Sequence, residues 1–137
     1  MKRKLNFAVA LFVAGSLLGC MTGTSYSSPR FSGNYSKITK EIASLSNAGY
    51  VRFVDMETTD WDNKVAKREL RIDLTKPNSF PDKMKAKEII SAVRANLIDA
   101  AKFDMYTITE VPEQEGNVIV FPAPKVLRSI TVLAKDL

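Results

Sequence analysis

Apolar residues recur at helical spacing shortly after the first quarter of the chain. The spacing predicts a helix over residues 37–48. Ser36 precedes this segment as an N-cap, and Gly49 follows it where a left-handed residue commonly ends a helix. The apolar positions that share one face are Ile38, Ile42 and Leu45.

A second and longer helix is predicted over residues 82–102. Ser79 and Asp82 stand at capping-box spacing, and Pro81 suits a first helical turn. The apolar face of this segment consists of Ala86, Ile90, Val93, Leu97 and Ala101, widened by Ile89 and Ile98. Such a stripe is typical of a helix that packs on a sheet.

Between the two helices the period of the pattern changes from 3.6 to 2. Residues 50–59 are rich in β-branched and aromatic residues, and residues 65–75 alternate strictly between apolar and charged positions. In the second segment Leu70, Ile72 and Leu74 point one way and Glu69, Arg71 and Asp73 the other. We expect a hairpin whose second strand has one wet face, connected by the turn-forming run Asp60-Trp61-Asp62-Asn63.

Three further strands are predicted over residues 106–111, 118–121 and 126–134. The order of elements is then α-β-β-α-β-β-β. Strands punctuated by single helices favour an α+β fold, with both helices packed on one face of a mostly antiparallel sheet. About a hundred residues from Ser36 onward suffice for one small core, so residues 36–137 are predicted to form a single domain.

The segment before this domain has a different composition. Residues 21–35 are rich in Ser, Thr and Gly, and Pro29 interrupts any regular pattern. With Cys20, these residues are predicted to form a flexible tether over residues 20–35.

The first nineteen residues have the layout of an export signal. Lys2, Arg3 and Lys4 precede an apolar run over residues 5–18, which is shorter than the roughly 20 residues that a membrane-spanning helix needs. Leu17-Leu18-Gly19-Cys20 then resembles the lipobox of bacterial lipoproteins. The resemblance implies cleavage after Gly19 and attachment of acyl chains to Cys20, which would anchor the protein to a membrane.

An ordinary signal peptide cleaved near residues 14–16 is the alternative, and it would leave Cys20 as a free thiol. In the lipoprotein interpretation, residue 21 is Met rather than the aspartate that often retains such proteins in the inner membrane. This favours the periplasmic face of the outer membrane, or the outer face of the plasma membrane in a Gram-positive source.

The net charge is most informative when the export signal is left out. The chain has 20 basic and 15 acidic residues, and the first nineteen residues hold three of the bases and no acid. The remaining part therefore has 17 bases, 15 acids and a net charge of +2. Nucleic acid is not an expected partner, because its recognition needs a clustered basic surface.

The residue inventory argues against catalysis. The chain has no histidine, and its single cysteine is Cys20. The run from Asp60 to Asn63 resembles the start of a calcium loop, but Lys64, Val65 and Arg71 stand where the remaining ligands and the glycine belong. The sequence therefore predicts no enzyme, no cofactor and no metal.

Trp61, the only tryptophan, lies at the predicted hairpin tip between Asp60 and Asp62. Tryptophan is enriched at binding hot spots, so these three residues are the candidate partner contact; the alternative is that Trp61 covers the sheet edge. Two functions stay open. The first is a lipid-anchored accessory or assembly factor of an envelope protein complex, and the second is a module that binds a small ligand or glycan.

Overall fold

A computed structural model describes residues 22–60, 67–113 and 125–137. Among these residues, five strands form one sheet in the spatial order β1-β2-β3-β4-β5. The strands are β1 (Thr22–Ser27), β2 (Tyr50–Asp60), β3 (Lys67–Thr75), β4 (Met105–Val111) and β5 (Arg128–Leu133). The helices are α2 (Tyr35–Ser46) and α3 (Lys83–Asn96), with 3₁₀ turns at Ala100–Lys102 and Ala134–Asp136.

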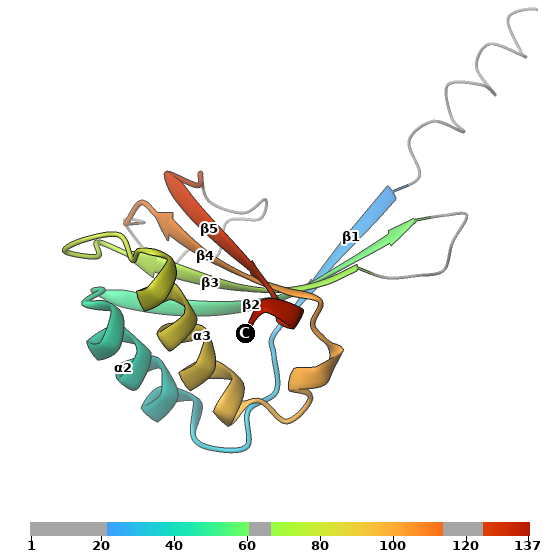
Figure 1. The fold of residues 1–137 in the computed structure, drawn as a ribbon, viewed down its shortest axis with the longest axis horizontal. Coiled ribbons are helices and arrows are strands. Elements are labelled where there is room, and N and C mark those ends of the chain that lie inside the picture. Colours follow the sequence, from blue (N-terminus) through green and yellow to red (C-terminus); the bar gives the residue numbers. More distant parts are fainter. Residues whose placement is uncertain (1–21, 61–66, 114–124) are drawn as a thin grey trace, which may run out of the picture.

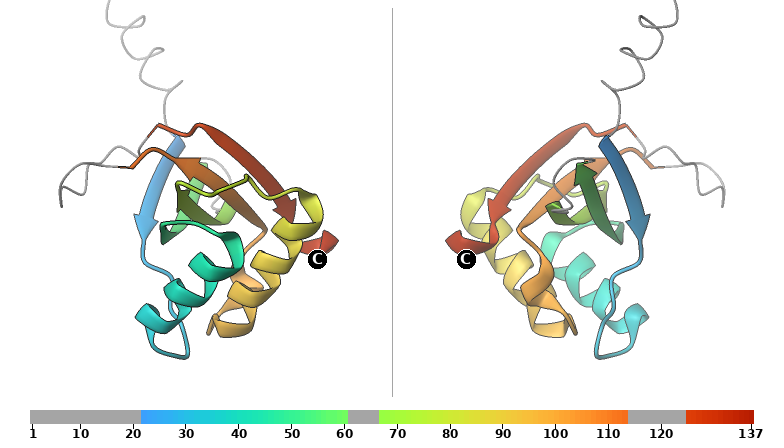
Figure 2. Two further views of the ribbon diagram at one scale, coloured as in Figure 1. Left: turned by 90° about the vertical axis from the view of Figure 1, so that its left-hand side faces the viewer. Right: turned by 90° about the vertical axis from the view of Figure 1, so that its right-hand side faces the viewer.

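The two helices lie side by side on the same face of the sheet (Figures 1 and 2). β3 and β4 are parallel neighbours joined through α3, and the other neighbouring strands pair antiparallel. This confirms an α+β fold with a mostly antiparallel sheet, and it confirms the predicted β2–β3 hairpin pairing. The order of the described elements is β-α-β-β-α-β-β, so it differs from the prediction.

Part of this difference comes from the segment that was predicted to be a tether. Residues 22–27 form β1, which pairs along its whole length with β2. The segment after β1 is also fastened to the domain, because Pro29 is buried and the Phe31 ring lies 5.0 Å from the ring of Phe53. The prediction of a flexible segment without regular structure is therefore wrong for residues 22–27, while residues 28–34 are irregular but packed on the domain. The predicted strand 118–121 lies outside the described residues.

Both helices are displaced from their predicted bounds for local reasons. Asn34, not Ser36, caps α2, because its side-chain oxygen accepts hydrogen bonds from the backbone N–H groups of Ser36 (2.9 Å) and Lys37 (3.3 Å). At the other end Asn47 adopts the left-handed conformation (φ 51°), two residues before Gly49. Asn tolerates this conformation better than most residues.

α3 begins as expected after Asp82, whose carboxylate accepts from the backbone N–H of Lys85 at 2.8 Å. It ends at Asn96, well before residue 102. Leu97 becomes extended and forms a β-bridge with Phe31, and the N–H of Ile98 donates to the carbonyl of Arg30. As a result, Ile98 and Ala101 are exposed rather than part of the apolar stripe.

The core lies between the helices and the sheet. Its members come from every second position of the strands and from the inner stripes of the helices. The fully buried large side chains include Ile42, Leu70, Ile72, Leu74, Ile89, Ile90, Val93, Tyr106 and Ile108. Among the described residues, no helix is long and apolar enough to cross a membrane.

Candidate functional site

The second face of the sheet, which α2 and α3 do not cover, is called the far face below. Alternation along β3 places Arg71 and Asp73 on this face, opposite the core residue Ile72. The prediction of a wet face is wrong for these two positions. Asp73 is 1% exposed and Arg71 is 8% exposed.

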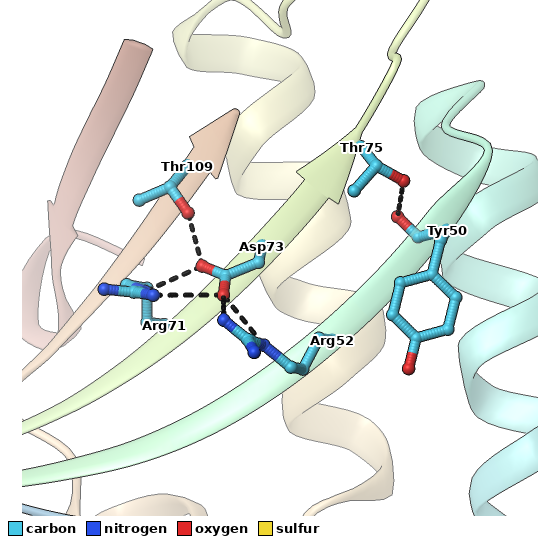
Figure 3. A network of polar contacts seen from close by, with 6 residues as sticks. All are labelled: Tyr50, Arg52, Arg71, Asp73, Thr75 and Thr109. Carbon is cyan, nitrogen blue, oxygen red and sulfur yellow. Dashed lines mark hydrogen bonds and ion pairs between the residues drawn. The ribbon is translucent and has the colours of Figure 1, made fainter. Parts of the chain in front are cut away.

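Asp73 is buried because neighbouring side chains close over its carboxylate (Figure 3). Arg52 donates to Oδ2 from Nε at 3.0 Å and from Nη2 at 2.6 Å. Arg71 donates from Nε to Oδ1 at 2.7 Å and from Nη2 to Oδ2 at 3.1 Å. The hydroxyl of Thr109 donates to Oδ1 at 2.5 Å. Five hydrogen bonds therefore converge on one carboxylate.

Strand register brings these residues together. Arg52 on β2 is the cross-strand partner of Asp73, and Thr109 on β4 is its partner on the other side. Directly opposite residues on one face lie close enough for their side chains to interact. The three strands β2, β3 and β4 thus build the cluster, which we call the Asp73 cluster: Arg52, Arg71, Asp73 and Thr109.

The electrostatics of the cluster favour the ionised form of Asp73. Burial by itself raises the pKa of Asp73, but the hydrogen bonds from Arg71, Thr109 and Arg52 outweigh it and lower the pKa below its ordinary value. A carboxylate of this kind is a poor general base, because its lone pairs are already engaged. Its role is to order two guanidinium groups, and two arginines with one aspartate leave one net positive charge.

Arg52 is the outward member of the cluster. Its side chain is 29% exposed, compared with 9% for Arg71. Next to it on the same face of β2 lies Tyr50, which is 58% exposed (Figure 3). Tyrosine and arginine are among the residues most enriched at the energetic centres of protein interfaces. The far face therefore offers a fixed cation beside an exposed aromatic ring.

A second polar group lies on the helix-covered face. Asp55 on β2 is 3% exposed, and its Oδ2 accepts from Nζ of Lys102 at 2.7 Å. Arg68 approaches the same oxygen at 3.9 Å and also pairs with Glu57 at 3.1 Å. These contacts fasten the 3₁₀ turn after α3 to the strands. We interpret them as structural.

The residues singled out in the sequence lie elsewhere. Cys20, Trp61 and Asp62 are outside the described residues. Asp60 is the last residue of β2, is exposed, and pairs with Thr22. It is eight positions from Arg52 along the strand, so the structure does not join it to the Asp73 cluster. In the described ranges, no three His, Cys, Asp or Glu residues are grouped so that they could hold a metal ion.

Sequence reasoning missed the Asp73 cluster, although one signal was present. Arg71 and Asp73 are opposite charges two positions apart, so they share a face in the middle of a regular strand. Asp is depleted in strands, so an Asp beside an Arg on one face of a strand is a reason to look for an ion pair. The contribution of Arg52 and Thr109 has no local signal.

No family model matches the sequence, and a comparison with curated proteins finds no match. A search of solved structures finds a likeness to the crystal structure of a sex pheromone staph-cAM373 precursor. The TM-score is 0.43 and the sequence identity is 11%. The match covers 83% of this chain and 41% of that protein, so the chain spans less than half of the length of its neighbour.

Proposed function

We propose that the chain is a lipid-anchored protein of the bacterial envelope that binds a partner protein through the far face of its sheet and catalyses no reaction. The lipobox at Leu17-Leu18-Gly19-Cys20 supports the anchor. Met21 favours the periplasmic face of the outer membrane, or the outer face of the plasma membrane in a Gram-positive cell. The partner would be a member of an envelope protein complex.

The observation that carries this proposal is that exposed Tyr50 lies beside half-buried Arg52 on β2. Asp73 already orders the guanidinium of Arg52 with two short hydrogen bonds, so a partner would not have to immobilise a free side chain. Arginine also presents a planar set of donors that matches carboxylates. We therefore expect the partner to place an acidic side chain against Arg52 and an apolar group against Tyr50.

A binding role also agrees with the chemistry of the cluster. Acid–base catalysis needs a group whose pKa lies near the working pH. The pKa of Asp73 is lowered instead, and its carboxylate is occupied by Arg52, Arg71 and Thr109. Asp73 thus fixes the positions of the guanidinium groups of Arg52 and Arg71.

The hairpin tip remains a second candidate contact, formed by Asp60, Trp61 and Asp62. Asp60 is exposed at the end of β2, which leaves it accessible to a partner. Asp60 and Tyr50 stand at opposite ends of β2, so each contact can be tested without altering the other.

The proposal is tested by crosslinking the native, acylated protein in its own envelope and identifying what is recovered with it. Tyr50→Ala is expected to reduce the yield of a specific protein partner at least several-fold, and Trp61→Ala reports on the hairpin tip. Met84→Ala is the matched control, because Met84 is 79% exposed but lies on α3, away from the far face.

Loss of the partner with Tyr50→Ala but not with Met84→Ala would support the far face as the interface. Equal recovery from all variants would contradict it. Recovery of no protein partner from the unmodified protein would instead favour the ligand- or glycan-binding alternative.

A further inference from the structure

Part of the sheet projects beyond the five-stranded region. β4 pairs with β3 only from Glu69 onward, and Glu69 is aligned through β2 with Tyr26 of β1. Past this limit lie the first residues of β1 and β3 and the last residues of β2. They form a narrower extension, called the β ribbon below, which consists of residues 22–25, 57–60 and 67–68. Figure 1 shows the start of β1 and the end of β2 extending away from the helices.

The β ribbon is continuous with the body of the domain. Every residue of β1 is paired with β2, from Thr22 opposite Asp60 to Ser27 opposite Asp55. Beyond β1, the N–H of Ile98 donates to the carbonyl of Arg30 at 3.0 Å, and the N–H of Ser32 donates to the carbonyl of Asn96 at 2.9 Å. Residues 22–32 therefore connect the ribbon to the core through a segment that is hydrogen-bonded to the rest of the domain.

The ribbon begins almost at the lipobox cysteine. Cys20 precedes Thr22 by two residues, and an extended chain spans at most about 3.6 Å per residue, so their Cα atoms lie within about 7 Å of each other. The headgroup layer of a bilayer is about as thick on each side of the hydrocarbon core. If Cys20 carries acyl chains, the tip of the ribbon must lie at the lipid headgroups.

We propose that the β ribbon is a stiff stalk that seats its tip on the lipid surface and holds the domain at a fixed height and orientation. This inference rests on the lipid anchor of the proposed function, and it excludes the second candidate contact at the hairpin tip, because that end of β2 would face lipid. The β1 part of the ribbon carries hydroxyl groups in Thr24 and Ser25 and no charged residue, so contact with headgroups desolvates no ionised group of β1.

The stalk has a consequence for the far face. Tyr50 is ten residues from Asp60 along β2, which corresponds to roughly 33 Å of strand. With the Asp60 end on the membrane, Tyr50 and Arg52 lie at the end of β2 that is farther from the lipid. The partner would meet them at that distance from the bilayer.

The test uses two variants of the acylated full chain, each with one added cysteine that is labelled with a fluorophore, in phosphatidylethanolamine–phosphatidylglycerol vesicles. Asp60→Cys reports on the tip of the ribbon, and Asn78→Cys, also exposed, reports on the loop that follows the opposite end of β3. Lipids with a quencher on the headgroup are expected to quench the Asp60 label at least three-fold more strongly than the Asn78 label.

A third protein, also carrying Asp60→Cys, has about ten Gly and Ser residues inserted between Met21 and Thr22, which should introduce a flexible tether. The stalk predicts that quenching at position 60 then falls toward the level at position 78. Equal quenching at both positions without the insertion would overturn the stalk, as would an insertion that changes nothing.

Mass spectrometry of the amino-terminal peptide separates this outcome from failure of the anchor. Acyl mass on Cys20 together with equal quenching would reject only the stalk. A Cys20→Ala variant gives the reference mass of a peptide that cannot be acylated. If the peptide of the original protein shows no added acyl mass relative to this reference, the anchor and the stalk are both rejected. Circular dichroism of each variant confirms that the domain is folded.

Discussion

On β3, two sets of side chains are withdrawn from water on opposite faces of the same strand. Leu70, Ile72 and Leu74 are fully buried under the helices. Arg71 and Asp73 are almost as inaccessible on the far face, which neither helix covers. The helices, a separate layer of the fold, bury the first set. The second set is covered by polar side chains of adjacent strands, which hydrogen-bond to the carboxylate of Asp73.

The two kinds of burial have different requirements. Apolar burial is non-directional, so any side chain of similar volume and polarity satisfies it approximately. Burial of a charge is tolerated only when its hydrogen-bonding groups are paired with good geometry. The core face should therefore respond to changes in volume, and the Asp73 cluster to changes in charge and in donors.

The largest effect is expected on the core face. Ile72→Ala removes three carbon atoms from a site with no exposure and should lower the free energy of unfolding by about 3 kcal/mol. Urea denaturation followed by circular dichroism measures the change. Ile98→Ala is the matched control, because Ile98 is 50% exposed and should change stability by less than about 0.5 kcal/mol. Equal losses in both variants would contradict the proposed difference in burial.

A somewhat smaller loss is expected from Asp73→Asn, which keeps the shape but removes the charge. Arg71 would stay largely buried without an ionic partner, while Arg52 can turn toward water because it is 29% exposed. We expect a loss of about 2 kcal/mol near neutral pH. The same denaturation assay measures it, with Asn78→Asp as an exposed control of opposite charge change.

The pH dependence provides an independent check of the same variant. The folded protein lowers the pKa of Asp73, so this group favours folding at pH values above the ordinary aspartate pKa of about 3.9. That contribution is lost as the pH falls through the lowered folded value. The difference between the original protein and Asp73→Asn should therefore shrink below about pH 4. A difference that is constant from pH 7 to pH 3 would show that the loss does not come from the charge of Asp73.

The sequence predicts one of the two faces of β3 better than the other. Strict alternation assigns Leu70, Ile72 and Leu74 to the core, and the structure confirms this assignment. The same alternation places Asp73 on the other face but cannot show that it is buried there. Its burial depends on Arg52 and Thr109, which lie 21 and 36 residues away in the chain.

Distant contacts also explain the largest errors in the predicted elements. The Ser- and Thr-rich composition of residues 22–27 resembles a linker, but pairing with β2 makes the segment a strand. Strand formation depends strongly on the neighbouring strand, which local composition does not reveal. α3 ends early because Leu97 pairs with Phe31, 66 positions earlier in the chain, although the apolar period itself continues. Capping by Asn34 and Asn47, in contrast, was within reach of local rules.

The smallest effect is expected from the hydroxyl of Thr109, the single uncharged donor of the Asp73 cluster. Thr109→Val keeps the volume and removes one hydrogen bond to Oδ1, which still accepts from Nε of Arg71. The carboxylate therefore stays paired, and the expected loss is about 1 kcal/mol in urea denaturation. Thr109→Ser, which keeps the hydroxyl but lacks the methyl group, should lose less. If the serine variant is the less stable of the two, packing of the methyl group outweighs the hydrogen bond at this position. The far face would then respond to changes in side-chain volume, as the core face does.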